Sequence, residues 1–192
     1  MSPSARTAEA CIQHRLDQAK VALGNLGAMR QDLTALIKNV QHALANGHMI
    51  LTCGNGGSAA EALHLSEELI GRYRSSRAPL KSICLCADTT ALTCIGNDFG
   101  FDHIYSRQVE ALASKGDQLI VLSTSGNSPN ILHALEAAKL RGAGTIGLLG
   151  ADGGKARALC DLPIVVSGVD GAAVQEIHQM IIHILCESLE PA

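Results

Sequence analysis

The hydrophobic positions along the chain predict an N-terminal helical region followed by alternating strands and helices. Residues 8–45 have a helical pattern with a break near Gly24–Gly27, and apolar side chains recur on one face at positions 33, 37, 40 and 44. Asn46-Gly47 is typical of a helix end. Five short apolar runs then predict strands, at residues 49–53, 82–86, 118–122, 145–149 and 162–166.

Helical segments follow several of these strands, at residues 59–70, 129–141 and 172–189, with a short helix after residues 150–154. The strands are continuous apolar runs, which indicates that both faces of the sheet are covered. We predict an α/β fold, a three-layer sandwich with a five-stranded, mostly parallel sheet between helices. Residues 1–192 are expected to form a single domain, with helices over 1–47 and the α/β core over 48–190. Whether the N-terminal helices pack on the core or form a dimerisation arm stays open.

Composition narrows the class of partner. The 192 residues are 47% hydrophobic, which suffices for a large core and excludes general disorder. The net charge of −3, the lack of a basic run and only four aromatic residues argue against nucleic acid. Seven cysteines without a CxxC motif predict reduced thiols in the cytoplasm. The apolar runs are too short for a membrane span, and Met1–Arg15 lacks the apolar region of a secretion signal.

Two loops that follow predicted strands carry the candidate binding chemistry. Residues 54–58 read Gly-Asn-Gly-Gly-Ser, and residues 123–128 read Ser-Thr-Ser-Gly-Asn-Ser. Ligands bind beyond the carboxyl ends of parallel strands, and helix N-termini with free N–H groups favour anions. We therefore predict a phosphate site, the alternative being ordinary helix caps and turns.

The sequence lacks strong nucleotide-binding motifs, which narrows the class of phosphate compound that we expect to bind. The Walker pattern is absent, and Gly54-x-Gly56-x-x-Ala59 is a weak match to the dinucleotide fingerprint. The nearest candidate acid after the second strand, Asp88, lies well past the usual spacing of about 20 residues. Hydroxyl-rich loops suit a phosphomonoester, such as a sugar phosphate, better than a nucleotide.

Two helices carry candidate metal ligands and catalytic groups. His64 and Glu68 are four residues apart and share a helix face, as do Gln175, Gln179 and His183 on the last helix. Histidine and carboxylate are common ligands of a divalent metal such as zinc. A site forms only if the two helices meet. The alternative is that His64 and His183 are surface or hydrogen-bonded core residues.

Six segments in order between about residues 50 and 185 carry a resemblance to one family. They are Cys53–Ser58, His64–Tyr73 with the pattern HxxxELxGRY, Gly96–Phe101, Ser123–Ser128, Asp152–Lys155 and Gln175–His183. Together they resemble the sedoheptulose-7-phosphate (phosphoheptose) isomerases of the sugar-isomerase (SIS) superfamily. The resemblance implies the SIS fold, with the N-terminal helices appended to the five-stranded parallel sheet, and a homotetramer with sites between subunits.

The resemblance also implies the reaction. It is the aldose–ketose isomerisation of D-sedoheptulose 7-phosphate to D-glycero-D-manno-heptose 7-phosphate through an enediol, in bacterial heptose biosynthesis for lipopolysaccharide or other surface glycans. An intramolecular oxidoreductase of this kind needs a base and a proton donor, which the resemblance assigns to Glu68 and His183. A zinc ion would be held by His64, Glu68, Gln175 and His183. Substrate contacts would come from Asn55, Gly56, Gly57, Ser58, Glu68, Asn97, Asp98, Ser123, Thr124, Ser125, Ser128 and Gln175.

The chain departs from the family pattern in one place. The family often has a Thr and an Arg shortly before the glutamine, where this chain has Gly171 and Ala173, and Asp170 is a candidate to compensate. This departure concerns substrate specificity more than reaction class. The alternative function is a non-catalytic SIS protein that binds a phosphosugar or a replication initiator, against which the presence of both Glu68 and His183 argues.

Overall fold

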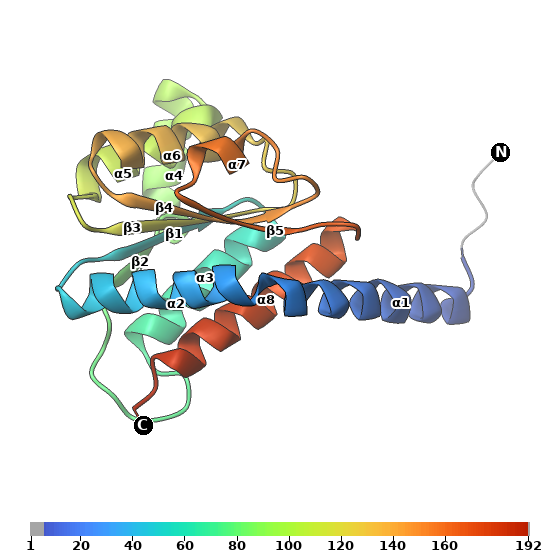
Figure 1. The fold of residues 1–192 in the computed structure, drawn as a ribbon. Coiled ribbons are helices and arrows are strands. Elements are labelled where there is room, and N and C mark those ends of the chain that lie inside the picture. The colour runs from blue at the N-terminus through green and yellow to red at the C-terminus, as the bar shows by residue number, and fades with distance from the viewer. Residues whose placement is uncertain (1–5, 192) are drawn as a thin grey trace.

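The computed structural model describes residues 6–191 and contains a five-stranded parallel sheet (Figure 1). Residues 1–5, part of the segment expected to lack a secretion signal, lie outside it, as does Ala192. The strand order is β2-β1-β3-β4-β5, and all four neighbouring pairs are parallel. The strands are β1 (Ile50–Gly54), β2 (Ser82–Cys84), β3 (Gln118–Ser123), β4 (Gly144–Gly150) and β5 (Leu162–Val166).

Helices cover both faces of the sheet and form the outer layers of the sandwich (Figure 1). One layer holds α1 (Ala8–Leu26), α2 (Arg30–Ala45), α3 (Gly57–Ile70) and α8 (Gly171–Ser188). The other holds α4 (Thr89–Phe99), α5 (Ser106–Leu112), α6 (Pro129–Leu140) and α7 (Ala156–Leu159). Two short 3₁₀ helices, η1 (Gly27–Met29) and η2 (Phe101–His103), complete the elements. This arrangement confirms the predicted three-layer α/β fold.

Burial explains why the strands carry unbroken apolar runs. Every residue of β1 is buried, and β3 and β4 are buried after their first residue, whereas the edge strands β2 and β5 are partly exposed. Two apolar clusters form the core, one on each face of the sheet. The central strands therefore contribute side chains to both clusters, which removes the alternation that a half-exposed strand would show.

The segment between residues 85 and 117 differs most from the prediction. The strand predicted over 82–86 ends at Cys84, because the chain turns there with an Ala87 N–H bond to the Cys84 carbonyl. Neither α4 nor α5 was predicted from the sequence. Asp88 caps α4 by accepting the N–H groups of Thr90 and Ala91. No residue of α4 is fully buried, and only Leu92 and Ile95 pack partly buried against the core, so its apolar stripe is short.

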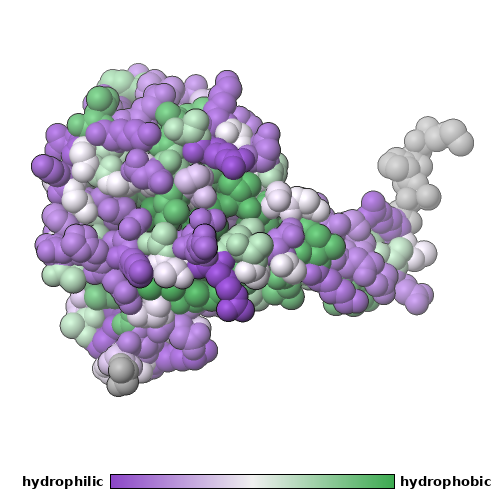
Figure 2. Space-filling view, viewed as in Figure 1, coloured by the Kyte–Doolittle hydropathy of each residue, from purple (hydrophilic) through white to green (hydrophobic). Residues whose placement is uncertain are grey.

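The N-terminal helix both packs on the core and extends beyond it. Near its C-terminal end, Asn25 donates to the Ser167 carbonyl at 2.9 Å, and Ala22 is fully buried. The other end projects from the body as an arm (Figures 1 and 2), and Ile12 and Leu16 are 61% and 51% exposed there. The predicted break falls at η1, between α1 and α2. Every helix among residues 6–191 is too short or too polar to cross a bilayer.

Candidate functional site

The strand order places two loops side by side at the carboxyl ends of the neighbouring strands β1 and β3. From β1 the chain moves outward to β2, and it then returns to β3 on the other side of β1 and continues to β4 and β5. Ligands in open α/β sheets bind beyond the carboxyl ends of the strands at such a switch point. The loops that leave β1 and β3 are the two glycine- and serine-rich segments that were predicted to bind phosphate.

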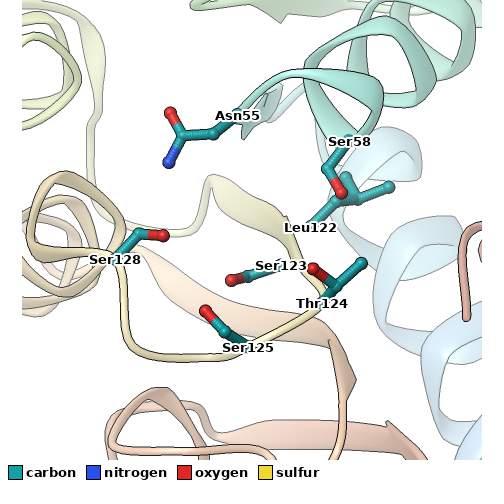
Figure 3. A pocket seen from close by; sticks show the side chains of 7 residues that line it. All are labelled: Asn55, Ser58, Leu122, Ser123, Thr124, Ser125 and Ser128. Carbon is teal, nitrogen blue, oxygen red and sulfur yellow. The ribbon is translucent and has the colours of Figure 1, made fainter. Parts of the chain in front are cut away.

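A small pocket lies between these loops (Figure 3) and has a volume of about 50 Å³. It brings together six of the expected substrate contacts from the two loops. The lining residues are Asn55, Ser58, Leu122, Ser123, Thr124, Ser125 and Ser128. Apart from Leu122, each offers a hydroxyl or an amide, so the pocket is rich in neutral hydrogen-bond donors.

The serine hydroxyls are oriented by the backbone of their own loop. Ser123 Oγ accepts the Gly126 N–H at 3.0 Å, and Ser125 Oγ accepts the Asn127 N–H at 3.2 Å. Each oxygen therefore uses a lone pair locally, and its own proton stays available to a ligand. In Figure 3 the hydroxyls of Ser123, Ser125 and Ser128 point into the space between the loops. This arrangement suits the oxygens of a phosphate group.

The Asp152–Lys155 segment supports the serine loop from outside. Gly126 has φ +63°, and a Cβ on it would lie 2.0 Å from the Gly153 carbonyl oxygen, so the two loops pack at backbone distance. Two hydrogen bonds hold them there, from Ala156 N–H to the Gly126 carbonyl at 2.9 Å and from Lys155 N–H to Asn127 Oδ1 at 3.1 Å. The Asp-Gly-Gly-Lys segment thus positions the pocket and does not line it.

Gln175, at the start of α8, lies directly against the β1 loop. A Cβ on Gly57 would lie 2.3 Å from Gln175 Nε2, so only glycine lets this amide approach so closely. The structure thereby brings Gln175 to the expected substrate loop. His183 lies about two turns further along the same helix.

A second cluster forms where α3 faces α8. His64 Nε2 lies 3.5 Å from Glu68 Oε1, and the His64 and His183 rings are 5.5 Å apart between centroids. Glu67 Oε1 lies 3.8 Å from His64 Nδ1, although the Glu67 side chain is 63% exposed. The predicted pairs on two helices therefore do meet in the fold.

The cluster contains groups that fit a metal ion. His64 Nε2 is buried and, among residues 6–191, has no hydrogen-bond partner of good geometry, and ligand atoms of His64, Glu67 and Glu68 lie within 4.8 Å of one another. A buried nitrogen without a partner costs free energy unless something binds it. His183 Nε2 lies 3.0 Å from the amide nitrogen of Gln179, which can only donate, so this ring nitrogen is the acceptor.

Six expected substrate contacts do not line the pocket: Gly56, Gly57, Glu68, Asn97, Asp98 and Gln175. Gly56 and Gly57 lie exposed in the β1 loop beside the pocket. Asn97 and Asp98 are exposed at the end of α4, where Asn97 Nδ2 donates to Asp98 Oδ1 at 2.7 Å. Within one chain the structure therefore does not bring Asn97 and Asp98 to the serine loop.

The residues at which the chain departs from the family pattern, Gly171 and Ala173, and their neighbour Asp170 make contacts of their own. Asp170 caps α8 by accepting the Ala173 N–H at 3.0 Å, which lowers the pKa of its carboxyl, and it pairs with Arg15 of α1. Asp170 is thus engaged in the helix cap and the Arg15 pair. Gly171 lies next to Thr124, because a Cβ added to Gly171 would lie 3.8 Å from Thr124 Cβ. Ala173 is fully buried.

Sequence reasoning missed two groups of buried polar residues near the site. Asn130 is paired with Asn55, and the Tyr105 hydroxyl donates to the Gly54 carbonyl. Neither residue carries a sequence signal for this role, because both lie in mixed polar and apolar segments. Burial also raises the pKa of Glu61 on α3 to about 7 and lowers the pKa of His178 on α8 to about 4.

Comparisons with known proteins agree on one family. Residues 17–150 match the SIS domain. The phosphoheptose isomerase of Aliarcobacter butzleri is 48% identical over 179 residues, which cover 93% of each chain, and that of Campylobacter concisus is 52% identical over 153 residues, which cover 80% and 81%.

Solved structures give the same result. The phosphoheptose isomerase of Neisseria gonorrhoeae superposes with a TM-score of 0.86 at 38% identity, covering 93% of this chain and 96% of that one. The enzyme of Francisella tularensis gives 0.91 at 32% identity, with 95% and 98% covered. The two loops, the α3–α8 cluster and these relatives lead to one conclusion: the chain belongs to the phosphoheptose isomerase family of SIS-domain proteins.

Proposed function

We propose that this protein isomerises D-sedoheptulose 7-phosphate to D-glycero-D-manno-heptose 7-phosphate, a step of bacterial heptose biosynthesis. The observation that carries the proposal is that α3 connects the hydroxyl-lined pocket, through Ser58, to His64 and Glu68, which face His183 of α8. His64 follows Ser58 by six residues, or about 9 Å of helix. That length is comparable with the separation of the phosphate and C1 in an extended heptulose phosphate.

The serine loop would hold the phosphate and the β1 loop the sugar. Ser123, Ser125 and Ser128 supply hydroxyl donors that already face the pocket. Asn55 and Gln175 supply amides that can hydrogen-bond sugar hydroxyls from the two sides of the β1 loop. A neutral donor set suits a phosphomonoester that must be released as product.

Glu68 and His183 would move the protons. The Glu68 side chain is 13% exposed, so its carboxylate is sheltered from water, which strengthens its interactions with substrate. Glu68 removes a proton from C1 while His183 protonates the C2 oxygen, which yields the enediol. Glu68 then returns the proton to C2 and His183 takes one from the C1 hydroxyl, which leaves the aldehyde and restores both groups.

His64, Glu68, Gln175 and His183 would hold a zinc ion. The buried His64 Nε2, which has no well-formed hydrogen bond among the described residues and lies 3.5 Å from Glu68 Oε1, supports this set, and Glu67 is a further carboxylate beside it. A bound zinc ion would polarise the substrate carbonyl. His183 would have to exchange its contact with Gln179 for a metal or substrate contact. Metal coordination lowers the basicity of a carboxylate, so Glu68 serves better as base if its second oxygen stays free.

The working enzyme would be a cytoplasmic homotetramer with sites between subunits. The projecting α1 arm and the exposed apolar residues Phe99 and Phe101, beside Asn97 and Asp98, support this assembly. A neighbouring subunit would be needed to bring Asn97 and Asp98 to a pocket. Seven free cysteines fit a reducing compartment.

An isomerisation assay tests the proposal. Purified protein is incubated with sedoheptulose 7-phosphate, as purified, after chelation and after zinc is restored. We expect turnover that chelation removes and zinc restores. Folded protein that gives no turnover with added zinc would overturn the assignment of substrate and reaction, whereas turnover that is insensitive to chelation would overturn the metal set alone.

A further inference from the structure

We propose that Asn130 is a positioning residue for the substrate loop, a role that rests on the proposed isomerase function. Its side chain is 1% exposed and does not line the pocket. Asn55 Nδ2 donates to Asn130 Oδ1 at 2.9 Å, and Asn130 Nδ2 donates to Asn55 Oδ1 at 2.9 Å. The two amides therefore form a reciprocal pair behind the residue that faces the ligand.

The pair fixes which atoms of Asn55 the ligand meets. Each amide has two N–H donors and one carbonyl oxygen, and the pair uses one donor and one oxygen lone pair of each. Turning either amide alone would set nitrogen against nitrogen and oxygen against oxygen, with the buried Asn130 left unsatisfied. Asn55 is thus held with its second N–H available to substrate, while its oxygen faces Asn130 and the Tyr105 hydroxyl.

The pair also joins the two halves of the pocket. Asn55 belongs to the loop after β1, whereas Asn130 is the second residue of α6, two residues after Ser128 in the serine loop. Tyr105 strengthens the same junction, since its buried hydroxyl donates to the Gly54 carbonyl and lies 3.5 Å from Asn55 Oδ1. Asn130 therefore sets the position of the sugar-binding loop relative to the phosphate-binding loop.

Two variants test this role. Asn130→Ala removes the pair and leaves a cavity, and Asn130→Leu removes the pair while filling most of the space. We expect both to lower kcat/KM for sedoheptulose 7-phosphate by about tenfold or more, mainly through KM, because a substrate contact is no longer oriented. A change that both variants share cannot come from the cavity.

A double-mutant cycle separates positioning from general stability. If Asn130 acts through Asn55, Asn55→Ala combined with Asn130→Ala should be no worse in kcat/KM than Asn55→Ala alone. Thr145→Val is the matched control, since Thr145 is a fully buried hydroxyl bonded to Asp161 at the opposite end of the sheet. It should lower Tm without changing KM.

The outcomes are distinct. Unchanged KM in both Asn130 variants, or losses that multiply in the double variant, would overturn the inference while the isomerase assignment stands. If the wild-type chain neither turns over nor binds the sugar phosphate by calorimetry, the proposed function fails before Asn130 is examined. Should Asn130→Ala not fold, Asn130→Leu and its combination with Asn55→Ala give the same comparison.

Discussion

His178 should make the folded protein lose stability as the pH falls. Its ring is fully buried on α8 beside the Leu149 backbone, and neither ring nitrogen has a hydrogen-bond partner of good geometry among the described residues. Burial lowers its pKa from 6.5 to about 4. Between pH 6.5 and pH 4 the unfolded chain therefore binds a proton at His178 and the folded chain does not. The contribution of the neutral His178 to the free energy of unfolding is complete above pH 6.5 and is lost as the pH falls to 4.

The size of the effect follows from the difference in pKa. A difference of about 2.5 units corresponds to about 3 kcal/mol when the loss is complete, of which about 2.5 kcal/mol is lost at pH 4.5. His178→Gln cannot take up the proton and should lack this component. The difference in unfolding free energy between wild type and variant should thus shift by about 2.5 kcal/mol in favour of the variant between pH 7.5 and pH 4.5.

Urea denaturation at several pH values measures this shift. Protein concentration must be the same throughout, because assembly adds its own contribution to stability. Exposed His42 on α2 gives a matched control, because His42→Gln makes the same substitution at the surface. A constant difference between wild type and His178→Gln from pH 7.5 to pH 4.5 would refute the reasoning, since it would mean that the buried ring is protonated as readily as in the unfolded chain.

Three further predictions concern the site. Glu68→Gln should abolish turnover, below about 0.1% of wild type, while circular dichroism and Tm stay near wild type; near-normal activity would remove Glu68 from the mechanism. Ser123→Ala combined with Ser128→Ala should raise KM by about tenfold or more and change kcat less, because two phosphate donors are lost; steady-state kinetics with an unchanged KM would argue against this loop. Gly57→Ala should displace the Gln175 amide and reduce kcat/KM by about tenfold. It should lower the free energy of unfolding by less than about 1 kcal/mol, because only the end of a flexible side chain must move. Full activity would show that the contact between Gly57 and Gln175 is dispensable.

The parts of the fold that sequence analysis predicted are those whose core contacts leave a periodic signal. The central strands and the helices α3, α6 and α8 each bury a continuous run or a stripe of apolar residues, and these were predicted within a few residues, as were the partly exposed edge strands β2 and β5. The helix α4 was missed because only Leu92 and Ile95 pack partly buried against the core, and α5 because it spans only seven residues. A short, partly buried stripe leaves only a weak periodic signal.

The candidate site divides in the same way. The loops after β1 and β3 were predicted to meet because the carboxyl ends of parallel strands share one edge, and the structure places them around one pocket. The position of Asn97 and Asp98 outside that pocket depends on the path of α4, and that helix was not predicted from the sequence. Asn130 was missed because a reciprocal amide pair joins residues 75 positions apart and needs no motif.

The short outer strands bear on how copies of this chain can associate. A sheet edge with free N–H and C=O groups can pair with another chain and lead to aggregation. Here β2 offers only three residues, and β5 contains Pro163, which has no N–H to donate. Neither edge is therefore a good template for a sixth strand. Specific association should proceed through helical surfaces such as α1 and α4, and the chain should resist sheet-extending aggregation even at high concentration.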